Sequence, residues 1–273
     1  MSLATETPAD EPGPAPAARS TWLTEAEQTD HYLHLDDAKI VATRALLACQ
    51  DNIYDVIETE AMACVHGSAG FGKSLSVNAT LREVAPDNTL RVVFRSRPTT
   101  RDIRHALFHS LHLPGKPPGH PIEFDALLKA SLSEQFRVLV CDEAQWMSRE
   151  CFEYWRHLWD DRDTRISVLF VGGGDCYKVL SQEPMLESRI YLWQKFRRME
   201  REEVLQVIPV FHPIWSSAPL DLVDYTDLHA GHGNFRNWAR LTRHVQQGLK
   251  RRPDEGVTRN LLEWVFSRIG GGK

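Results

Sequence analysis

The fold is decided by residues 61–81, AMACVHGSAGFGKSLSVNATL, which run from a short apolar segment through glycines into a helical pattern. The glycine-rich part matches the pattern G-x-x-x-x-G-K-[ST], beginning at Gly67 and ending at Gly72, Lys73 and Ser74. A strand, a glycine loop and a helix in this order are the context in which this pattern holds a polyphosphate. The alternative is a chance match in a glycine-rich turn, which this context disfavours.

Backbone groups of the loop carry the predicted binding. Successive N–H groups point into the loop, and the following helix adds the positive end of its dipole. Glycines allow close approach of the backbone, while Lys73 can reach the β- and γ-phosphates and Ser74 can ligate Mg²⁺. The predicted nucleotide-binding residues are Gly67, Ser68, Ala69, Gly70, Phe71, Gly72, Lys73, Ser74 and Leu75.

A second motif, FRVLVCDEAQ, begins as an apolar run at residues 136–141 and ends with Asp142, Glu143 and two further residues. Such runs are typical of parallel strands buried on both faces, and ligands of open α/β sheets bind at the carboxyl ends of strands. We expect Asp142 to hold Mg²⁺ and Glu143 to orient and deprotonate an attacking water. The alternative is two solvated acids at the start of a helix, and the upstream loop argues against it.

Helical and strand patterns alternate through about residue 198, which predicts a parallel sheet covered by helices on both faces. Residues 1–20 are rich in Pro, Ala and acidic side chains and are expected to be a disordered tail. Residues 21–198 are expected to form the α/β domain and residues 199–273 a helical domain. The expected elements are helices at 31–50, 101–113, 122–132 and from a cap at Ser148, with strands at 61–66, 89–95, 136–141 and 165–171, and a Pro/Gly-rich loop at 114–121.

Composition excludes several classes of protein. The 273 residues are 42% apolar and 25% charged, which is ordinary for a globular chain. No apolar run approaches the roughly 18 residues of a membrane helix, and the N-terminus lacks the pattern of a secretory signal. Five scattered cysteines predict neither disulfides nor a zinc module and fit the cytoplasm. A formal charge of −5 argues against a uniformly basic nucleic-acid binder but allows a local basic patch.

Together these motifs resemble the AAA+ ATPases, and the DEAQ wording with the overall size resembles more narrowly the TniB, MuB and TnsC group of transposition ATPases. The resemblance covers about residues 30–270. It implies an α/β AAA+ P-loop NTPase fold, with a five-stranded parallel sheet sandwiched by helices and followed by a small helical lid. It also implies Mg²⁺-dependent ATP hydrolysis that is slow and depends on oligomerisation.

Further site residues follow from the resemblance alone. The family places a polar residue at the end of the strand after the Asp-Glu strand, but this chain has glycines at 172–174, and Asp175 is an approximate substitute. This departure leaves the hydrolysis rate open. An arginine that reaches the γ-phosphate of a neighbouring subunit is matched best by Arg189, with Arg197 or Arg198 as the fallback. The alternative for Arg189 is a surface ion pair with Glu187.

The lid helix of the family carries a second arginine near the phosphates. The segment HGNFRNWARL resembles this helix, and Arg236 fits the arginine, with Gly231 and Gly233 in the preceding turn. The alternative is an ordinary solvated arginine.

A basic segment, RVVFRSRPTTR at residues 91–101, is the candidate nucleic-acid surface. In the resembling transposition ATPases this region faces a central channel and grips the DNA backbone, which requires charge but no reading of sequence. A solvated loop is the alternative. The residues assigned to DNA are Arg95, Arg97, Thr99, Thr100 and Arg101, with Arg91 and Arg104 nearby.

Three functions fit these features. The first is an ATP-dependent regulator of transposition that forms a homo-oligomeric ring or filament on duplex DNA. One possible arrangement has six subunits per turn. This regulator would recruit a transposase and disassemble on hydrolysis, without a membrane. The second is a helicase loader that prefers single strands. The third is an ATP-gated signalling or scaffold module without DNA.

Overall fold

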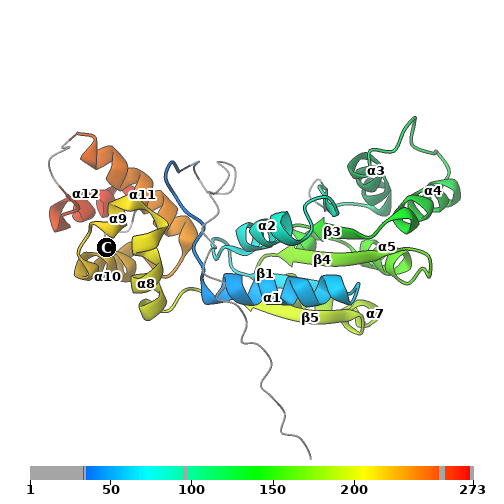
Figure 1. Ribbon diagram of the computed structural model, residues 1–273, viewed down its shortest axis with the longest axis horizontal. Helices are drawn as coiled ribbons and strands as arrows, with labels where there is room; N and C mark the ends of the chain where they lie inside the picture. The colour runs from blue at the N-terminus through cyan, green and yellow to red at the C-terminus, as the bar shows by residue number, and fades with distance from the viewer. Residues whose placement is uncertain (1–32, 34, 95–96, 252–255, 271–273) are drawn as a thin grey trace, which may run out of the picture.

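The computed structural model describes residues 33, 35–94, 97–251 and 256–270. These residues form two lobes, one built on a sheet and one of helices only (Figure 1). The expected tail at residues 1–20 lies outside the described part of the chain.

The first lobe contains a five-stranded sheet in which all pairs of neighbouring strands are parallel. Its order is β2-β3-β4-β1-β5, so β4 is the middle strand and β1 lies beside it. The predicted fold class, a five-stranded parallel sheet between helices, is therefore confirmed. The strands are β1 (Met62–Gly67), β2 (Thr89–Val92), β3 (Arg137–Cys141), β4 (Ile166–Gly172) and β5 (Ile190–Phe196).

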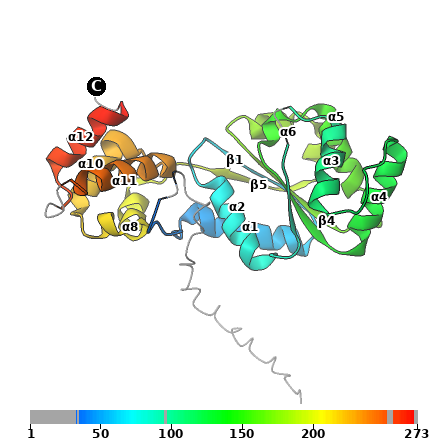
Figure 2. The same cartoon turned by 90° about the horizontal axis from the view of Figure 1, so that it is seen from above.

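Helices cover both faces of this sheet, as Figure 2 shows. Side chains of β1 alternate between the faces: Met62 and Cys64 belong to one buried cluster, and Ala63 and Val65 to the other. Two helices, α1 (Arg44–Glu58) and α2 (Lys73–Val84), cover the face of the second cluster. The other face is covered by α3 (Thr100–Ser110), α4 (Pro121–Glu134), α5 (Arg149–Trp159), α6 (Cys176–Ser181) and α7 (Pro184–Glu187).

The edge strand β5 has no counterpart among the strands assigned from sequence. Its ends, Ile190 and Phe196, are buried, whereas Tyr191 between them is 58% exposed. Edge strands are covered incompletely, so they lack the continuous apolar run by which the buried strands were recognised.

The helix expected at residues 31–50 begins only at Arg44, which corrects that prediction. Thr43 caps it, since its hydroxyl oxygen accepts a hydrogen bond from the N–H of Leu46 at 3.0 Å. The preceding residues pack on the helical lobe instead, where the N–H of Lys39 donates to the carbonyl of Phe211 at 2.8 Å. Leu35, Ala38 and Val41 are buried in the core of that lobe.

Two smaller expectations also change. The strand expected at 89–95 ends at Val92 among the described residues. Ser148 precedes α5 as expected, but its side chain makes no capping hydrogen bond to the helix backbone.

The helical lobe has its own core around two tryptophans. The rings of Trp215 and Trp238 meet edge to face at 5.0 Å, and their indole N–H groups donate to Thr242 and Asp227. No helix in the described ranges is both long and apolar enough to cross a membrane. The lobe comprises α8 (Arg201–Phe211), α9 (Pro213–Ser216), α10 (Leu220–Thr226), the π-helical turn η2 (Asp227–Gly231), α11 (Phe235–Leu249) and α12 (Arg259–Ile269).

Candidate functional site

The glycine loop connects β1 to α2 at the carboxyl end of β1. Gly67, Gly70 and Gly72 have φ angles of 147°, 83° and 90°, a region that side chains rarely adopt. A Cβ on Gly67 would lie 3.1 Å from the carbonyl carbon of Phe196 in β5. The glycines are therefore required both by the turn and by the strand beside it.

Lys73 and Ser74 begin α2 and face the end of β3. The Lys73 ammonium donates to the carbonyls of Gly67 and Ser68 at 2.8 and 2.9 Å. Burial lowers the pKa of Lys73, and the carboxylates of Asp142 and Glu143 oppose that shift.

The predicted metal ligands come together across the two motifs. The Ser74 hydroxyl donates to Oδ2 of Asp142 at 3.2 Å, although the residues are 68 positions apart in the chain. A hydroxyl and a carboxylate beside a polyphosphate loop are the oxygen ligands that Mg²⁺ takes, so this pair fits the ion.

Glu143 follows β3 in a tight turn. It adopts φ 54° and ψ 36°, a left-handed conformation that costs energy for a residue with a side chain. Its N–H donates to Oδ1 of Asp142 at 2.8 Å. The 3₁₀ turn η1 (Ala144–Trp146) follows directly. Backbone strain at this point fits a site held by its surroundings.

Sequence reasoning missed Gln145, which belongs to the same turn. Its amide nitrogen donates to Oε2 of Glu143, and its amide oxygen accepts from the N–H of Gly173 at 2.9 Å. A polar side chain therefore does reach the end of β4, but it comes from the β3 side. The sequence offered one signal for this residue, the glutamine at the end of the DEAQ motif at residues 142–145.

A cavity of about 580 Å³ opens between the two lobes over the loop. Its polar wall includes Lys73, Ser74, Asp142 and Glu143. This volume is in the range of small-molecule and cofactor sites, and the carboxyl ends of the strands are where such folds bind ligands. Of the predicted binding residues, Phe71 and Leu75 also line the cavity. The part of the apolar wall that was not foreseen from sequence includes Ile40, Val41, Leu46, Phe211, Phe235 and Ala239.

The helical lobe touches the loop through the start of α11. Asn234 caps this helix, its side-chain oxygen accepting from the N–H of Arg236 at 2.9 Å, and its amide donates to the carbonyl of Ala69 at 3.0 Å. The N–H of Arg236 also lies 3.3 Å from the carbonyl of Gly70. The structure thus places Arg236 on the cavity wall, beside the loop.

Arg189 lies away from this cavity. It immediately precedes Ile190, which pairs with Met62 at the start of β1, so it lies at the opposite end of the sheet from the loop. Its Nε donates to Asp160 at 2.7 Å and its guanidinium also donates to the carbonyl of Met185 at 2.9 Å. The expected alternative partner, Glu187, is not the one found.

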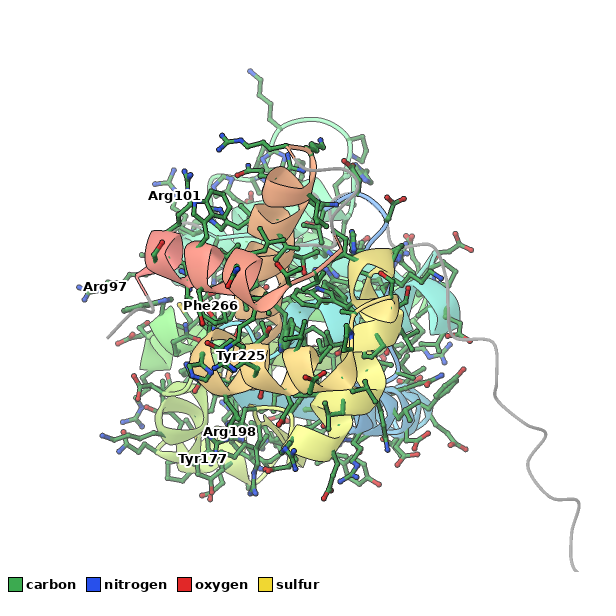
Figure 3. All side chains as sticks on the ribbon, turned by 90° about the vertical axis from the view of Figure 1, so that its left-hand side faces the viewer. Arg97, Arg101, Tyr177, Arg198, Tyr225 and Phe266 are labelled. Atoms are coloured by element: carbon green, nitrogen blue, oxygen red, sulfur yellow. The ribbon has the colours of Figure 1, made fainter. Side chains whose placement is uncertain are left out.

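The fallback arginines lie at the other end of the same strand. Arg197 and Arg198 are exposed and follow Phe196, the partner of Gly67. Arg198 is visible on the face seen from the helical lobe (Figure 3).

The basic segment divides into structural and exposed residues. Arg104 makes two hydrogen bonds to Asp125, at 2.7 and 3.0 Å, and lies 4.6 Å over the ring of Tyr154. Although burial opposes the effect, the hydrogen bonds from Arg104 and Tyr154 lower the pKa of Asp125. Arg91 donates to Asn78.

The residues assigned to DNA are only partly available. Thr99 caps α3, since its hydroxyl accepts from the N–H of Asp102 at 3.3 Å and donates to that carboxylate at 2.7 Å. Thr100 is the half-buried first residue of α3. Arg97 and Arg101 are exposed and extend outward at one edge of the molecule (Figure 3). Arg95 lies outside the described residues.

Comparisons with known proteins agree with this architecture. Residues 56–180 match the family model of an AAA domain. The fold is similar to Cdc6p from Pyrobaculum aerophilum, with a TM-score of 0.68 and 15% identity over 89% of this chain and 71% of that one. It is also similar to the Aeropyrum pernix ORC2 protein in its ADPNP-ADP complexes, with a TM-score of 0.65 and 13% identity over 81% and 66%.

A third similar structure is the Aeropyrum pernix ORC1 protein in complex with DNA, with a TM-score of 0.59 and 14% identity over 82% of this chain and 65% of that one. The chain thus spans about two thirds of the length of these structures. No curated protein matches the sequence. At these identities the likeness shows the fold, which is that of an AAA+ P-loop NTPase.

Proposed function

We propose that this chain, which contains an AAA domain and has the AAA+ P-loop fold, binds ATP with Mg²⁺ and hydrolyses it. The observation that carries the proposal is the meeting of Ser74 and Asp142 at 3.2 Å beneath the loop that holds Lys73. Ser74 and Asp142 would hold the ion, and Mg²⁺ when bound would offset the charge of the phosphates.

Each wall of the cavity has a role in this proposal. The N–H groups of the loop bind the phosphates, and Lys73 exchanges its two backbone carbonyl partners for phosphate oxygens. Glu143 orients a water and takes its proton. The apolar wall around Val41 and Phe211 excludes water from the adenine base of ATP. Arg236 approaches the phosphates from the helical lobe.

A complete site would need a second subunit. Arg189 lies at the opposite end of the sheet from its own loop, so it can serve only the site of a neighbouring subunit. To do so it would exchange the carboxylate of Asp160 for a phosphate. Mixing an Arg189→Ala protein with a Lys73→Ala protein should restore ATPase activity that neither has alone. Failure of every such mixture, with Arg197 and Arg198 tested in turn, would contradict a shared site.

We also propose that nucleotide binding controls attachment to DNA through Arg97 and Arg101. The support is their exposure on one edge of the molecule, together with the similar fold of an ORC1 protein in complex with DNA. Similarity to ORC and Cdc6 structures favours a role in replication, as an initiator or helicase loader. Regulation of transposition, with a transposase as partner, is the second candidate and is favoured by the DEAQ motif at residues 142–145.

One experiment tests the central proposal and separates the DNA roles. Binding of duplex and single-stranded DNA would be measured with and without ATP, at rising salt, for the wild type and for Lys73→Ala. We expect ATP-dependent binding that weakens steeply with salt and is lost in Lys73→Ala. A preference for single strands would favour a loader and for duplex a transposition regulator. ATP binding without DNA binding at low salt would reject both roles and leave a scaffold module.

A further inference from the structure

Gln145 lies between the carboxylate of Glu143 and the end of the neighbouring strand β4, and it is hydrogen-bonded to both. We infer that Gln145 is a positioning residue, which holds the Glu143 carboxylate in the orientation that activates water. This inference rests on the proposed ATP hydrolysis and adds a residue to that site.

The two ends of the amide have different partners. The Nε2 group donates to Oε2 of Glu143, while Oε1 accepts from the N–H of Gly173 at 2.9 Å. The Gly173 bond fixes which end of the amide faces Glu143, because an N–H requires an acceptor. Within the described residues, no group donates to the second oxygen of Glu143, which leaves it available to a water.

The glycines at the end of β4 make room for this amide. A Cβ on Gly172 would overlap the side-chain oxygen of Gln145 and lie 2.7 Å from the Cβ of Cys176. A Cβ on Gly173 would lie 3.4 Å from the amide nitrogen of Gln145. Nothing lies within 4 Å of such an atom on Gly174. Gly172 and Gly173 therefore leave space for the amide of Gln145, which supplies the polar group that the end of β4 itself lacks.

Positioning is needed because the turn alone leaves Glu143 poorly constrained. Its side chain is exposed, and its backbone is held in a left-handed conformation. A flexible carboxylate spends little time in one orientation, and a misplacement of about 1 Å can cost a factor of about 100 in rate. Gln145 is half-buried and anchored at both ends of its amide, so it supplies the missing constraint.

The competing interpretation is that Gln145 only ties β3 to β4. Two Gln145 variants distinguish the interpretations, with Gln182→Ala as the control, since Gln182 is exposed and does not line the cavity. For Gln145→Ala we expect ATP affinity and KM within about threefold of wild type and kcat lower by about 10- to 100-fold. Gln182→Ala should leave all three unchanged.

Gln145→Glu adds a pH test that a structural tie would not pass. The introduced carboxyl can still accept from Gly173, but when ionised it repels Glu143, and when protonated it can donate to it. We expect kcat to be low at pH 8 and to recover toward wild type as the pH falls, whereas Gln145→Ala shows no such recovery.

The outcomes separate the inference from the proposed function. Unchanged kcat in Gln145→Ala, or a loss of kcat matched by an equal loss of ATP affinity with no recovery of Gln145→Glu at lower pH, would overturn the positioning role while hydrolysis stands. Absence of hydrolysis in the wild type under conditions where ATP binds would overturn the proposed function itself.

Discussion

The glycine loop and the basic segment both stand out in the sequence, but different interactions determine their structures. At residues 67–74 the glycines, the strand before them and the helix after them set the geometry through the backbone. At residues 91–104 the arginines look equivalent in the sequence, but distant partners divide them. Arg104 is held by Asp125 and Tyr154, whereas Arg97 and Arg101 extend into solvent. A site made by the backbone can be recognised locally, and a side chain gains its role from what packs around it.

The largest expected effect tests the backbone half of this comparison. Gly67→Ala should lower ATP affinity at least about 100-fold and destabilise the fold by on the order of 3 kcal/mol, because the new Cβ meets the backbone of β5 at a φ unsuited to a side chain. The matched control is Gly119→Ala, where a Cβ meets nothing within 4 Å and the residue does not line the cavity, so neither quantity should change. Calorimetric titration and denaturant unfolding measure both. Wild-type affinity in Gly67→Ala would mean that the backbone does not set the site.

The second prediction tests the side-chain half with a pair of arginines. Arg104→Met should destabilise the protein by about 2 kcal/mol, since it leaves the partly buried Asp125 without its cation. Arg101→Met should leave stability unchanged but weaken DNA binding and reduce the salt slope by about 1. Urea unfolding and salt-dependent binding of both variants provide the measurements. If the two variants behaved alike in both assays, the division of the segment into structural and exposed arginines would be wrong.

The same ion pair gives a third prediction, on acid stability. The pKa of Asp125 is lowered in the folded protein, so its stabilising effect is present above the ordinary aspartate pKa and is lost as the pH falls through the lower, folded value. Stability of the wild type should therefore fall below about pH 4 more steeply than that of Arg104→Met. Parallel unfolding curves between pH 5 and 3 would contradict this linkage.

The candidate site was predictable from sequence where it depends on motifs. The parallel strands of one sheet end at the same edge, and the apolar runs and the glycine loop identify these strand ends in the sequence. This arrangement brings together Lys73, Ser74, Asp142 and Glu143. The motif DEAQ marks Gln145, but its contact with Gly173 was not predictable, since that contact joins the ends of two strands. Contacts between segments far apart in the chain also limit what the sequence predicts about the fold.

The segment before α1 illustrates this limit. Residues 31–50 carry a helical pattern, but residues 35–43 form turns and irregular structure that packs on the helical lobe. The apolar wall of the cavity depends on this contact, because it brings Val41 opposite Phe211 from about 170 residues further along the chain. Local periodicity cannot register such a partner.

The smallest expected effect concerns the histidine that fastens this segment to the helical lobe. His212 is 2% exposed; its Nε2 lies 3.0 Å from the carbonyl of Asp36, and its Nδ1 accepts from the N–H of Ile214 at 3.1 Å. Nδ1 cannot accept this bond when protonated, so the contact requires the neutral ring. Burial lowers the pKa of His212, against a smaller opposing effect of the Asp36 carbonyl and Asp37.

Because the folded protein prefers neutral His212, its contribution to stability is complete above the ordinary histidine pKa and is lost as the pH falls through the lower, folded value. Between pH 7 and 5 the melting temperature of the wild type should drop by on the order of 3 °C more than that of His212→Gln, which has no proton to gain there. His229→Gln is the control, since His229 is exposed. Equal drops in wild type and His212→Gln would show that the backbone contact between Lys39 and Phe211, and not the His212 side chain, holds this segment. The segment would then resemble the glycine loop, which the backbone determines, rather than Arg104, which side chains hold.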